Sequence, residues 1–367
     1  MRHLYLAATG QNRGKTTTSL GLLDLFRTQG FRTGFMKPVG QRTVIEAGVP
    51  ADEDAVLMKA VFDLPEPLAA MSPVHIPRGF TKSYIAGEVV EDLGARIRAA
   101  HATFADHELL LVEGTGHAGV GAVVGLSNAV VAAMLGTPAV IVSGGGVGRP
   151  IDEIVLNAAL FAAHGVPVAG AIVNKVEVET QPGIERTLER GLAMHGIPLL
   201  GILPYRPILS NPSLAMVAEG VPGELVNGGS DLDLVIGAVG IAAMHSDHVL
   251  ERLKPGTLVI VPGDREELLL RLLEDHVDRP RTGRAPIVCG LILTGYRPSG
   301  RVVEAIREAG LFALFNPEDT YTLASAVHDL LVKTHAADTE KIALIKALVR
   351  EHLAIDRLLE AAAPVGR

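Results

Sequence analysis

The sequence predicts an α/β protein: a doubly wound parallel sheet that carries a phosphate-binding (P-loop) motif, followed by a second, smaller α/β domain. Three observations lead to this fold class. Short apolar runs alternate with segments of helical periodicity along most of the chain, and strands that alternate with helices in this way form parallel sheets. A strand–glycine loop–helix pattern opens the chain. The composition, 48% hydrophobic with 40 glycines and no tryptophan, suits buried parallel strands and tight strand–helix turns.

The first predicted elements are a strand at residues 4–8, a loop at 9–17 and a helix over 19–26. The loop ends in Gly-Lys-Thr, and such loops hold phosphates with backbone N–H groups at a helix N-terminus, where the helix dipole favours negative charge. We expect Lys15 to reach the distal phosphates and the Thr16 hydroxyl to hold Mg²⁺. The candidate nucleotide-binding residues of the loop are Gly10, Gln11, Asn12, Arg13, Gly14, Lys15, Thr16 and Thr17.

A second strand, at residues 32–36, ends at Lys37. A lysine at the carboxyl end of a parallel strand lies at the edge where open α/β sheets bind ligands, although a solvated lysine before the turn is the alternative. The acidic run at 52–54 then precedes a helix at 55–62. Because acidic residues commonly cap helix N-termini, we expect one of them to be a cap and another to face a metal.

A helix is predicted over residues 81–105, and the buried strand that follows ends in Glu113. In phosphate-loop proteins an acid in this place orients Mg²⁺ or its water; an ordinary strand-end carboxylate is the alternative. The glycines at 114–121 allow the backbone to approach a ligand closely. His117 lies among them, and both contact with an anionic ligand and a hydrogen bond that braces the loop are open.

Further strands are predicted at residues 138–142, 168–173 and 199–203, with helices over 151–164 and up to residue 192. Asn174 follows the middle strand. An Asn-Lys pair in this place reads a nucleobase edge in several phosphate-loop families, and a helix cap is the alternative.

Small and polar residues at 227–230 predict a linker, which divides the chain into domains at 1–225 and 230–367. Beyond it the pattern predicts strands at 258–261, 287–293 and 311–315 and a closing helix over 339–360. The turns at 263–265 and 319–321 would line a second ligand or subunit site, or Asp264 and Arg265 would form a salt bridge.

Charge and cysteine content exclude several classes of protein. The net charge is −8 and no basic stripe stands out, which argues against nucleic acid as a main partner. The single cysteine, Cys289, lies in an apolar run; it cannot form an internal disulfide and is expected to be a buried strand residue. No apolar run reaches the length of a membrane span and no signal-type segment opens the chain, so a soluble cytoplasmic protein is expected.

Residues 1–225 resemble the phosphate-loop group that contains dethiobiotin synthetase and the cobyrinic acid a,c-diamide synthases. They are most similar to the dethiobiotin-synthetase-like N-terminal domain of bacterial phosphate acetyltransferases, and residues 230–360 resemble the DRTGG domain that follows in the same proteins. The segments that carry the first resemblance are residues 9–17, 36–41, 52–55, 113–121 and 201–205; Gly-Asp-Arg at 263–265 and Leu-Ile-Leu-Thr-Gly at 291–295 carry the second.

The resemblance implies an ATP site with Mg²⁺, in which two lysines are catalytic. In the ligases of this group ATP phosphorylates a carboxylate or carbamate, which nitrogen then attacks. Positive charge aimed at the γ-phosphoryl group stabilises such a transfer. The implied roles are phosphate contact for Lys15, Mg²⁺ binding for Thr16, Asp54 and Glu113, stabilisation of the transferred phosphoryl group for Lys37, and adenine contact for Asn174.

Two functions are compatible with these residues. The first is a regulatory or sensory Mg-ATP-binding module without acetyltransferase activity, because the chain stops where a phosphate acetyltransferase would begin its catalytic domain. The second is a free-standing ATP-dependent ligase or kinase that activates a small carboxylate, or an ATPase. Glutamine-dependent amidation is disfavoured because Cys289 has no nearby His motif. The expected partners are a nucleotide, a small carboxylate or a partner enzyme, and a second copy in a dimer.

Overall fold

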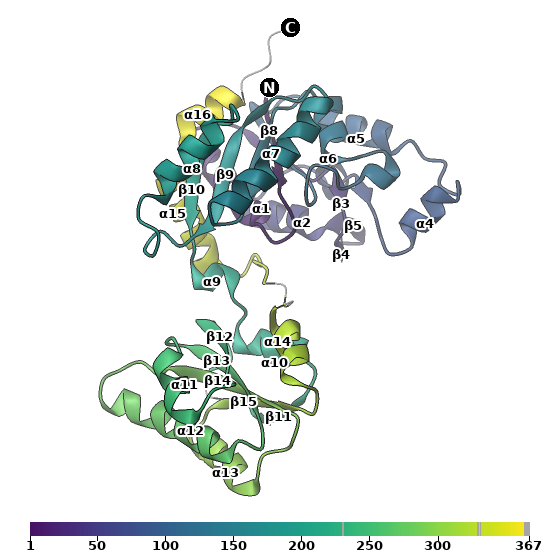
Figure 1. The fold of residues 1–367 in the computed structure, drawn as a ribbon. Helices are drawn as coiled ribbons and strands as arrows, with labels where there is room; N and C mark the ends of the chain where they lie inside the picture. The colour runs from purple at the N-terminus through teal and green to yellow at the C-terminus, as the bar shows by residue number, and fades with distance from the viewer. Residues whose placement is uncertain (230, 329, 331, 363–367) are drawn as a thin grey trace. The chain divides into compact units, whose positions relative to one another are not determined.

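The computed structural model describes residues 1–229, 231–328, 330 and 332–362 (Figure 1). The chain divides into two compact units. Unit 1 comprises Met1–Tyr205 together with Thr334–Arg367, and unit 2 comprises Arg206–Lys333.

Unit 1 is built on a parallel sheet that, within the described residues, has six strands in the order β10-β9-β8-β1-β7-β2. Its central strand β1 pairs with β7 on one side and β8 on the other, so the connections leave in opposite directions from β1. Ligands bind at such a switch point, outside the carboxyl ends of the strands. The strands are β1 (Arg2–Ala8), β2 (Thr33–Met36), β7 (Leu109–Glu113), β8 (Ala139–Ser143), β9 (Val168–Val176) and β10 (Leu199–Pro204).

Helices cover the sheet on both faces, as its continuous apolar strands require, and the doubly wound fold is confirmed. Two short strand pairs, β3 with β6 and β4 with β5, lie outside the main sheet. The remaining elements of unit 1 are α1 (Lys15–Thr28), β3 (Val39–Gly40), β4 (Thr43–Glu46), β5 (Val49–Asp52), α2 (Glu53–Phe62), α3 (Leu68–Met71), β6 (Val74–His75), α4 (Phe80–Ile85), α5 (Leu93–Ala102), η1 (Ala122–Val124), α6 (Asn128–Met134), α7 (Gly148–Ala163), α8 (Ile184–Ala193), α15 (Thr339–His352) and α16 (Ile355–Ala361).

Two expected long helices are each divided. The segment 81–105 forms α4 and α5, because Gly87 adopts a φ of +74° and the Asp92 carboxylate caps a new helix by accepting a hydrogen bond from Ala95 N at 2.8 Å. The segment 339–360 forms α15 and α16. Between them Leu353 makes an isolated antiparallel bridge to Gly201 at the edge of the sheet.

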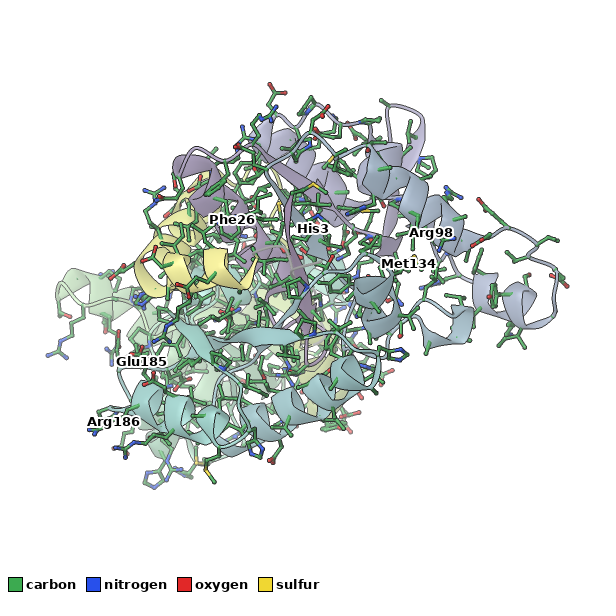
Figure 2. All side chains as sticks on the ribbon, turned by 90° about the horizontal axis from the view of Figure 1, so that it is seen from above. His3, Phe26, Arg98, Met134, Glu185 and Arg186 are labelled. Atoms are coloured by element: carbon green, nitrogen blue, oxygen red, sulfur yellow. The ribbon has the colours of Figure 1, made fainter. Side chains whose placement is uncertain are left out.

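The compact units do not follow the expected ranges 1–225 and 230–367. The chain leaves unit 1 after β10, and α15 and α16 return to it. Figure 2 shows these two helices in yellow; α15 packs against α1, which carries the labelled Phe26, and α16 contacts β9. The expected linker at 227–230 does not separate the units. Asn227 ends a strand of unit 2 and donates a hydrogen bond to Leu311 O at 2.8 Å. Ser230 and residues 363–367 lie outside the described part of the chain.

Unit 2 is the expected smaller α/β domain. Its sheet, as described, has five strands in the order β11-β15-β14-β13-β12, with β11 antiparallel to β15 and the other pairs parallel. The elements are α9 (Pro207–Ser210), α10 (Leu214–Gly220), β11 (Glu224–Asn227), β12 (Ala238–Ile241), α11 (Ser246–Arg252), β13 (Thr257–Pro262), α12 (Glu266–Arg281), β14 (Val288–Thr294), α13 (Gly300–Glu308), β15 (Phe312–Asn316) and α14 (Thr320–His328).

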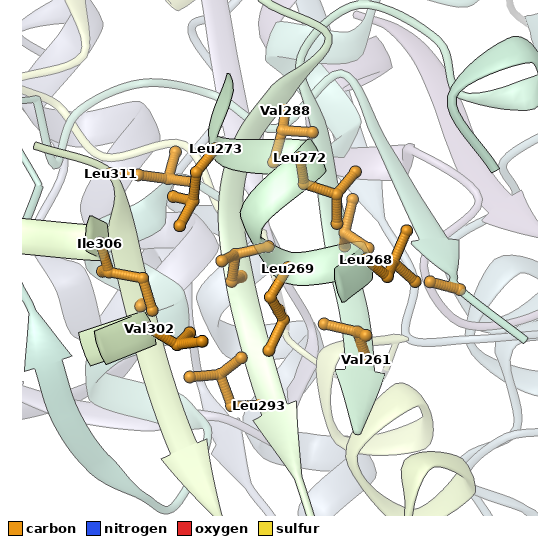
Figure 3. Close-up of a cluster of buried hydrophobic side chains, with 14 of the residues drawn as sticks. Val261, Leu268, Leu269, Leu272, Leu273, Val288, Leu293, Val302, Ile306 and Leu311 are labelled. Atoms are coloured by element: carbon orange, nitrogen blue, oxygen red, sulfur yellow. The ribbon is translucent and has the colours of Figure 1, made fainter. Parts of the chain in front are cut away.

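Two apolar clusters form the core of unit 2. On one face α12 and α13 pack on the sheet through residues such as Leu269, Leu272 and Ile306 (Figure 3). On the other face the cluster includes Leu214 and Val217 of α10 and Leu323 and Val327 of α14. Among the described residues, none of the helices combines the length and the apolar character needed to cross a lipid bilayer.

Candidate functional site

The phosphate-binding loop joins β1 to α1 at the switch point of the sheet. Gly14 precedes the helix with φ +88°, ψ +30°, a left-handed conformation that glycine adopts without steric cost. No side chain of the described residues caps this helix N-terminus. Its first N–H groups therefore remain available for an anion.

Lys15, in the first turn of α1, is half-buried. No hydrogen bond or ion pair of its side chain is found within the described residues. Burial, and to a lesser extent the positive charge of Lys37, lowers the pKa of Lys15 to about 8, while Glu113 and Asp54 oppose the shift. A phosphate group would supply the negative partner that this ammonium group needs.

Lys37, which follows β2, lies between two carboxylates, Asp54 of α2 and Glu113 at the end of β7. Its Nζ donates to Asp54 Oδ2 at 2.6 Å and to Glu113 Oε1 at 2.7 Å, and the lysine is only 4% exposed. Burial alone would lower the pKa of Lys37, but Asp54 and Glu113 raise it well above its ordinary value. The interpretation of Lys37 as a solvated turn residue is therefore wrong.

The two carboxylates also meet the hydroxyl of the loop threonine. Thr16 Oγ1 donates to Asp54 Oδ1 at 3.0 Å and lies 3.4 Å from Glu113 Oε1. Burial would raise the pKa of Asp54, but Lys37 lowers it to about 2. Burial raises the pKa of Glu113, although Lys37 opposes this shift. The structure thus brings Thr16, Lys37, Asp54 and Glu113 into one cluster beside the phosphate-binding loop.

This donor set fits Mg²⁺. Glu113 is completely buried, and its Oε2 has no hydrogen-bond partner among the described residues, so an acceptor oxygen is left for a cation. No group of three or more His, Cys, Asp or Glu side chains in the described chain could hold a metal alone. Mg²⁺ in proteins is usually coordinated by one or two carboxylates together with phosphate oxygens and water. Two carboxylates and a threonine hydroxyl beside a phosphate-binding loop match this preference.

The acidic run at the start of α2 contains the expected helix cap, and the expected contact of another of its residues with a metal stays a prediction. Asp52 is the N-cap, since its Oδ1 accepts from Asp54 N at 3.1 Å. Its Oδ2 accepts from Arg42 N at 3.3 Å. Asp54, two residues further, is then directed to Thr16 and Lys37.

Asn174 lies directly against the loop. A Cβ added at Gly14 would lie 1.9 Å from Asn174 Nδ2. The amide donates to Arg13 O at 3.1 Å and accepts from Lys175 N at 2.8 Å. In the structure this side chain therefore braces the loop backbone, and its contact with adenine stays a prediction.

Several residues of the site were not singled out from the sequence. Glu153 of α7 accepts hydrogen bonds from Thr9 at 2.8 Å and from Arg13 at 3.2 Å, and so ties the start of the loop to its middle. Asn128 holds the glycine-rich segment after β7 by donating to Thr115 O and His117 O. The sequence offered only a weak signal, since both are single polar residues near the start of helices that are mostly apolar further along.

The remaining candidates have local structural roles. His117 is exposed, and its Nδ1 accepts from Gly119 N at 3.2 Å, which is the loop-bracing arrangement. Arg265 does not pair with Asp264; it donates to the carbonyl oxygens of Ala242 and Met244, each at 2.8 Å. Asp319 accepts from the N–H groups of Tyr321 and Thr322 at the start of α14.

Comparisons with known proteins cover both units. Residues 2–213 match the family described as AAA domain, and residues 216–330 match the DRTGG domain. The chain is 27% identical to a phosphate acetyltransferase of Pseudomonas putida, in a match that covers 96% of this chain. It is 26% identical to a phosphate acetyltransferase of Synechocystis, in a match that covers 97% of this chain. Both matches cover 51% of the relative, so the chain spans about half the length of these curated relatives. Among solved structures, MinD of Pyrococcus horikoshii complexed with Mg-ADP has 15% identity and a TM-score of 0.36, over 56% of this chain and 83% of that one.

The names of the relatives correct the functional expectation. Five proteins at 23–27% identity, matched over at least 96% of this chain, are named phosphate acetyltransferase. The expected regulatory module without acetyltransferase activity is therefore wrong, and the alternative of a free-standing carboxylate-activating ligase finds no support. The error has a physical reason: residues that hold a nucleotide indicate binding, and they do not specify the reaction of the protein that contains them.

Proposed function

The chain belongs to the AAA domain family that residues 2–213 match. We propose that its unit 1 binds a magnesium–ATP complex and that the protein transfers an acetyl group to phosphate. The acetyl-transfer part rests on the names of the curated relatives. The chain spans about half of their length. We therefore propose the activity for the protein as a whole and name no residue of this chain that carries out acetyl transfer. A cytoplasmic location and a dimer remain predictions.

One observation carries the nucleotide part of the proposal: Lys15 and the uncapped start of α1 lie next to the cluster of Thr16, Lys37, Asp54 and Glu113. An unpartnered ammonium group and free backbone N–H groups suit phosphate oxygens. The carboxylates and the threonine hydroxyl suit Mg²⁺, which would neutralise phosphate charge when bound. Recognition of both components of Mg-ATP at one sheet edge is what the cluster supports best.

In this proposal the side chains of the site divide the binding of phosphate, metal and loop backbone among them. Lys15 binds the terminal phosphates. Asp54 and Glu113 hold the metal, directly or through water, together with Thr16. Lys37 supplies positive charge beside the terminal phosphoryl group, and Asn174 and Glu153 keep the loop in shape. Lys15 and Lys37 are therefore the candidates for stabilising charge on that group.

Calorimetry of the full chain with Mg-ATP tests the binding. We expect saturable binding that Lys15→Ala abolishes, because the variant loses the loop's charged phosphate contact. Lys82→Ala is the control, since Lys82 is an exposed lysine of α4 in the same unit. Equal affinities of Lys15→Ala and the wild type would contradict the nucleotide site.

The acetyl-transfer part needs its own assay. The purified full chain is incubated with phosphate and acetyl coenzyme A, a common acetyl donor. Transfer of the acetyl group to phosphate releases the free thiol of coenzyme A, which is measured with a thiol reagent. Phosphate-dependent thiol release above the buffer blank supports the proposal. A rate equal to the blank, in a preparation that binds Mg-ATP, would contradict acetyl transfer by this chain and leave nucleotide binding in place.

A further inference from the structure

Helix α15, which the chain adds only after unit 2, is packed against the helix that carries the phosphate-loop lysine and threonine. We propose that α15 positions α1 and α2 for nucleotide binding, so that the affinity of unit 1 for Mg-ATP depends on side chains at 346–350. This inference rests on the proposed nucleotide site and adds a positioning element to it.

Ion pairs and close packing join α15 to α1. Asp24 of α1 accepts Lys346 Nζ at 3.1 Å and Arg350 at 2.9 Å, and its side chain is 13% exposed. Next to them, a Cβ added at Gly21 would lie 2.2 Å from Val349 Cγ2. Residue 21 must therefore be small for the two helices to approach this closely, and the charged pairs hold them in register.

A third helix meets the other two at the same place. The Lys346 ammonium lies 4.9 Å from the centroid of the Phe62 ring, and the guanidinium of Arg27, at the end of α1, lies 5.8 Å from it. Both distances suit cation–π attraction. Phe62 is the last residue of α2, the helix whose first turn contains Asp54. Lys346 thus contacts both helices that present site residues.

The contacts lie at the ends of α1 and α2 that are remote from the site. At 1.5 Å per residue, Asp24 is about 12 Å along α1 from Thr16, and Phe62 is about 12 Å along α2 from Asp54. Because an α-helix moves nearly as a rigid rod, a change of tilt at these ends displaces Thr16 and Asp54 relative to each other. Their hydrogen bond of 3.0 Å leaves little tolerance for such a displacement.

The segment that directly follows the C-terminal end of α15 is also fixed. Leu353 bridges Gly201 in β10, Ala354 N donates to Leu200 O at 3.1 Å, and Arg357 donates to Leu199 O at 3.1 Å. The helix therefore connects the edge strand of the sheet to α1 and α2 and resists their movement.

The experiment measures Mg-ATP affinity by calorimetry on the full chain, at a temperature where circular dichroism shows each variant folded. The double variant Lys346→Ala/Arg350→Ala is expected to bind roughly fivefold more weakly, the effect of losing two partly exposed ion pairs. Gly21→Val, which separates the helices, is expected to bind more weakly still. Lys341→Ala is the matched control, since Lys341 pairs with Asp338 of its own segment, and Lys346→Arg should retain wild-type affinity.

Hydrogen exchange gives a second readout. If α15 only stabilised the fold, Mg-ATP would not change exchange in this helix. Added Mg-ATP should slow exchange of amides in 339–352 of the wild type, and slow it less in the double variant. Wild-type affinity in a double variant of reduced thermal stability would show that α15 only stabilises the fold, and would overturn the inference. Absence of Mg-ATP binding by the wild type would overturn the proposed nucleotide site and the inference with it, so the two failures are distinguishable.

Discussion

Replacement of Lys37 by methionine removes the cation from between two buried carboxylates. Lys37 Nζ lies 2.6 Å from Asp54 and 2.7 Å from Glu113, and methionine retains much of the length of the side chain. Removal of one partner from a buried ion pair costs about 3–5 kcal/mol, because the remaining charge stays buried without a counter-charge. This corresponds to a roughly hundredfold to several-thousandfold increase in the unfolding constant.

The cost is expected to depend on pH. Burial already raises the pKa of Glu113 above its unfolded value of 4.5, and loss of Lys37 raises it further. A carboxyl whose folded pKa exceeds its unfolded pKa binds protons more readily in the folded state, so the variant regains stability as the pH falls toward 4.5. Asp54 behaves oppositely in the wild type: its pKa of about 2 contributes stability above 3.8 that is lost as the pH falls toward 2.

Urea unfolding at pH 8 and pH 5, followed by circular dichroism and by hydrogen exchange of peptides from unit 1, measures this difference. The free energy of unfolding that Lys37→Met loses relative to the wild type should be larger at pH 8 than at pH 5. Lys59→Met is the control, because Lys59 Nζ donates to the carbonyl oxygens of Leu64 and Glu66 and its loss should cost the same at both pH values. The reasoning is refuted if Lys37→Met matches the wild type at pH 8, or loses equal stability at both.

Two further predictions concern the only thiol and the loop glycine. Burial raises the pKa of Cys289 to about 12 from 9.0, so iodoacetamide at pH 8 should alkylate the folded chain about a thousandfold more slowly than the urea-unfolded chain; comparable rates would contradict the buried position. Gly14→Ala forces alanine into a left-handed conformation at a cost of about 1–2 kcal/mol and drives its Cβ against Asn174. Mg-ATP affinity should fall in calorimetry, and an unchanged affinity would show that the loop does not need this geometry.

Much of the fold could be predicted from local patterns. Apolar runs identified the strands β1, β2, β7, β8, β9 and β10, because parallel strands covered by helices on both faces are continuously hydrophobic. The Gly-Lys-Thr signature located the loop, and the strand-end positions of Lys37 and Glu113 placed both at the carboxyl edge of the sheet. These inferences succeeded because neighbours in sequence are sufficient to specify them.

The domain division could not be predicted in the same way. The helical pattern at 339–360 correctly indicates helix, but periodicity does not specify which unit buries its apolar face. The structure assigns α15 and α16 to unit 1, where Gly21 and Asp24 provide a complementary surface. These residues precede α15 by more than three hundred positions, and no local signal connects them.

Local sequence patterns are enough to specify the class of fold, the phosphate-binding loop and the set of acidic and basic residues available at one sheet edge. The use of these residues depends on tertiary contacts: Lys37 neutralises Asp54 and Glu113, Asn174 braces the loop, and α15 packs against α1. The physical reason is that a charge or an amide acquires its role from the partners that burial forces on it. Strand order and helix packing select those partners from positions far apart in the chain.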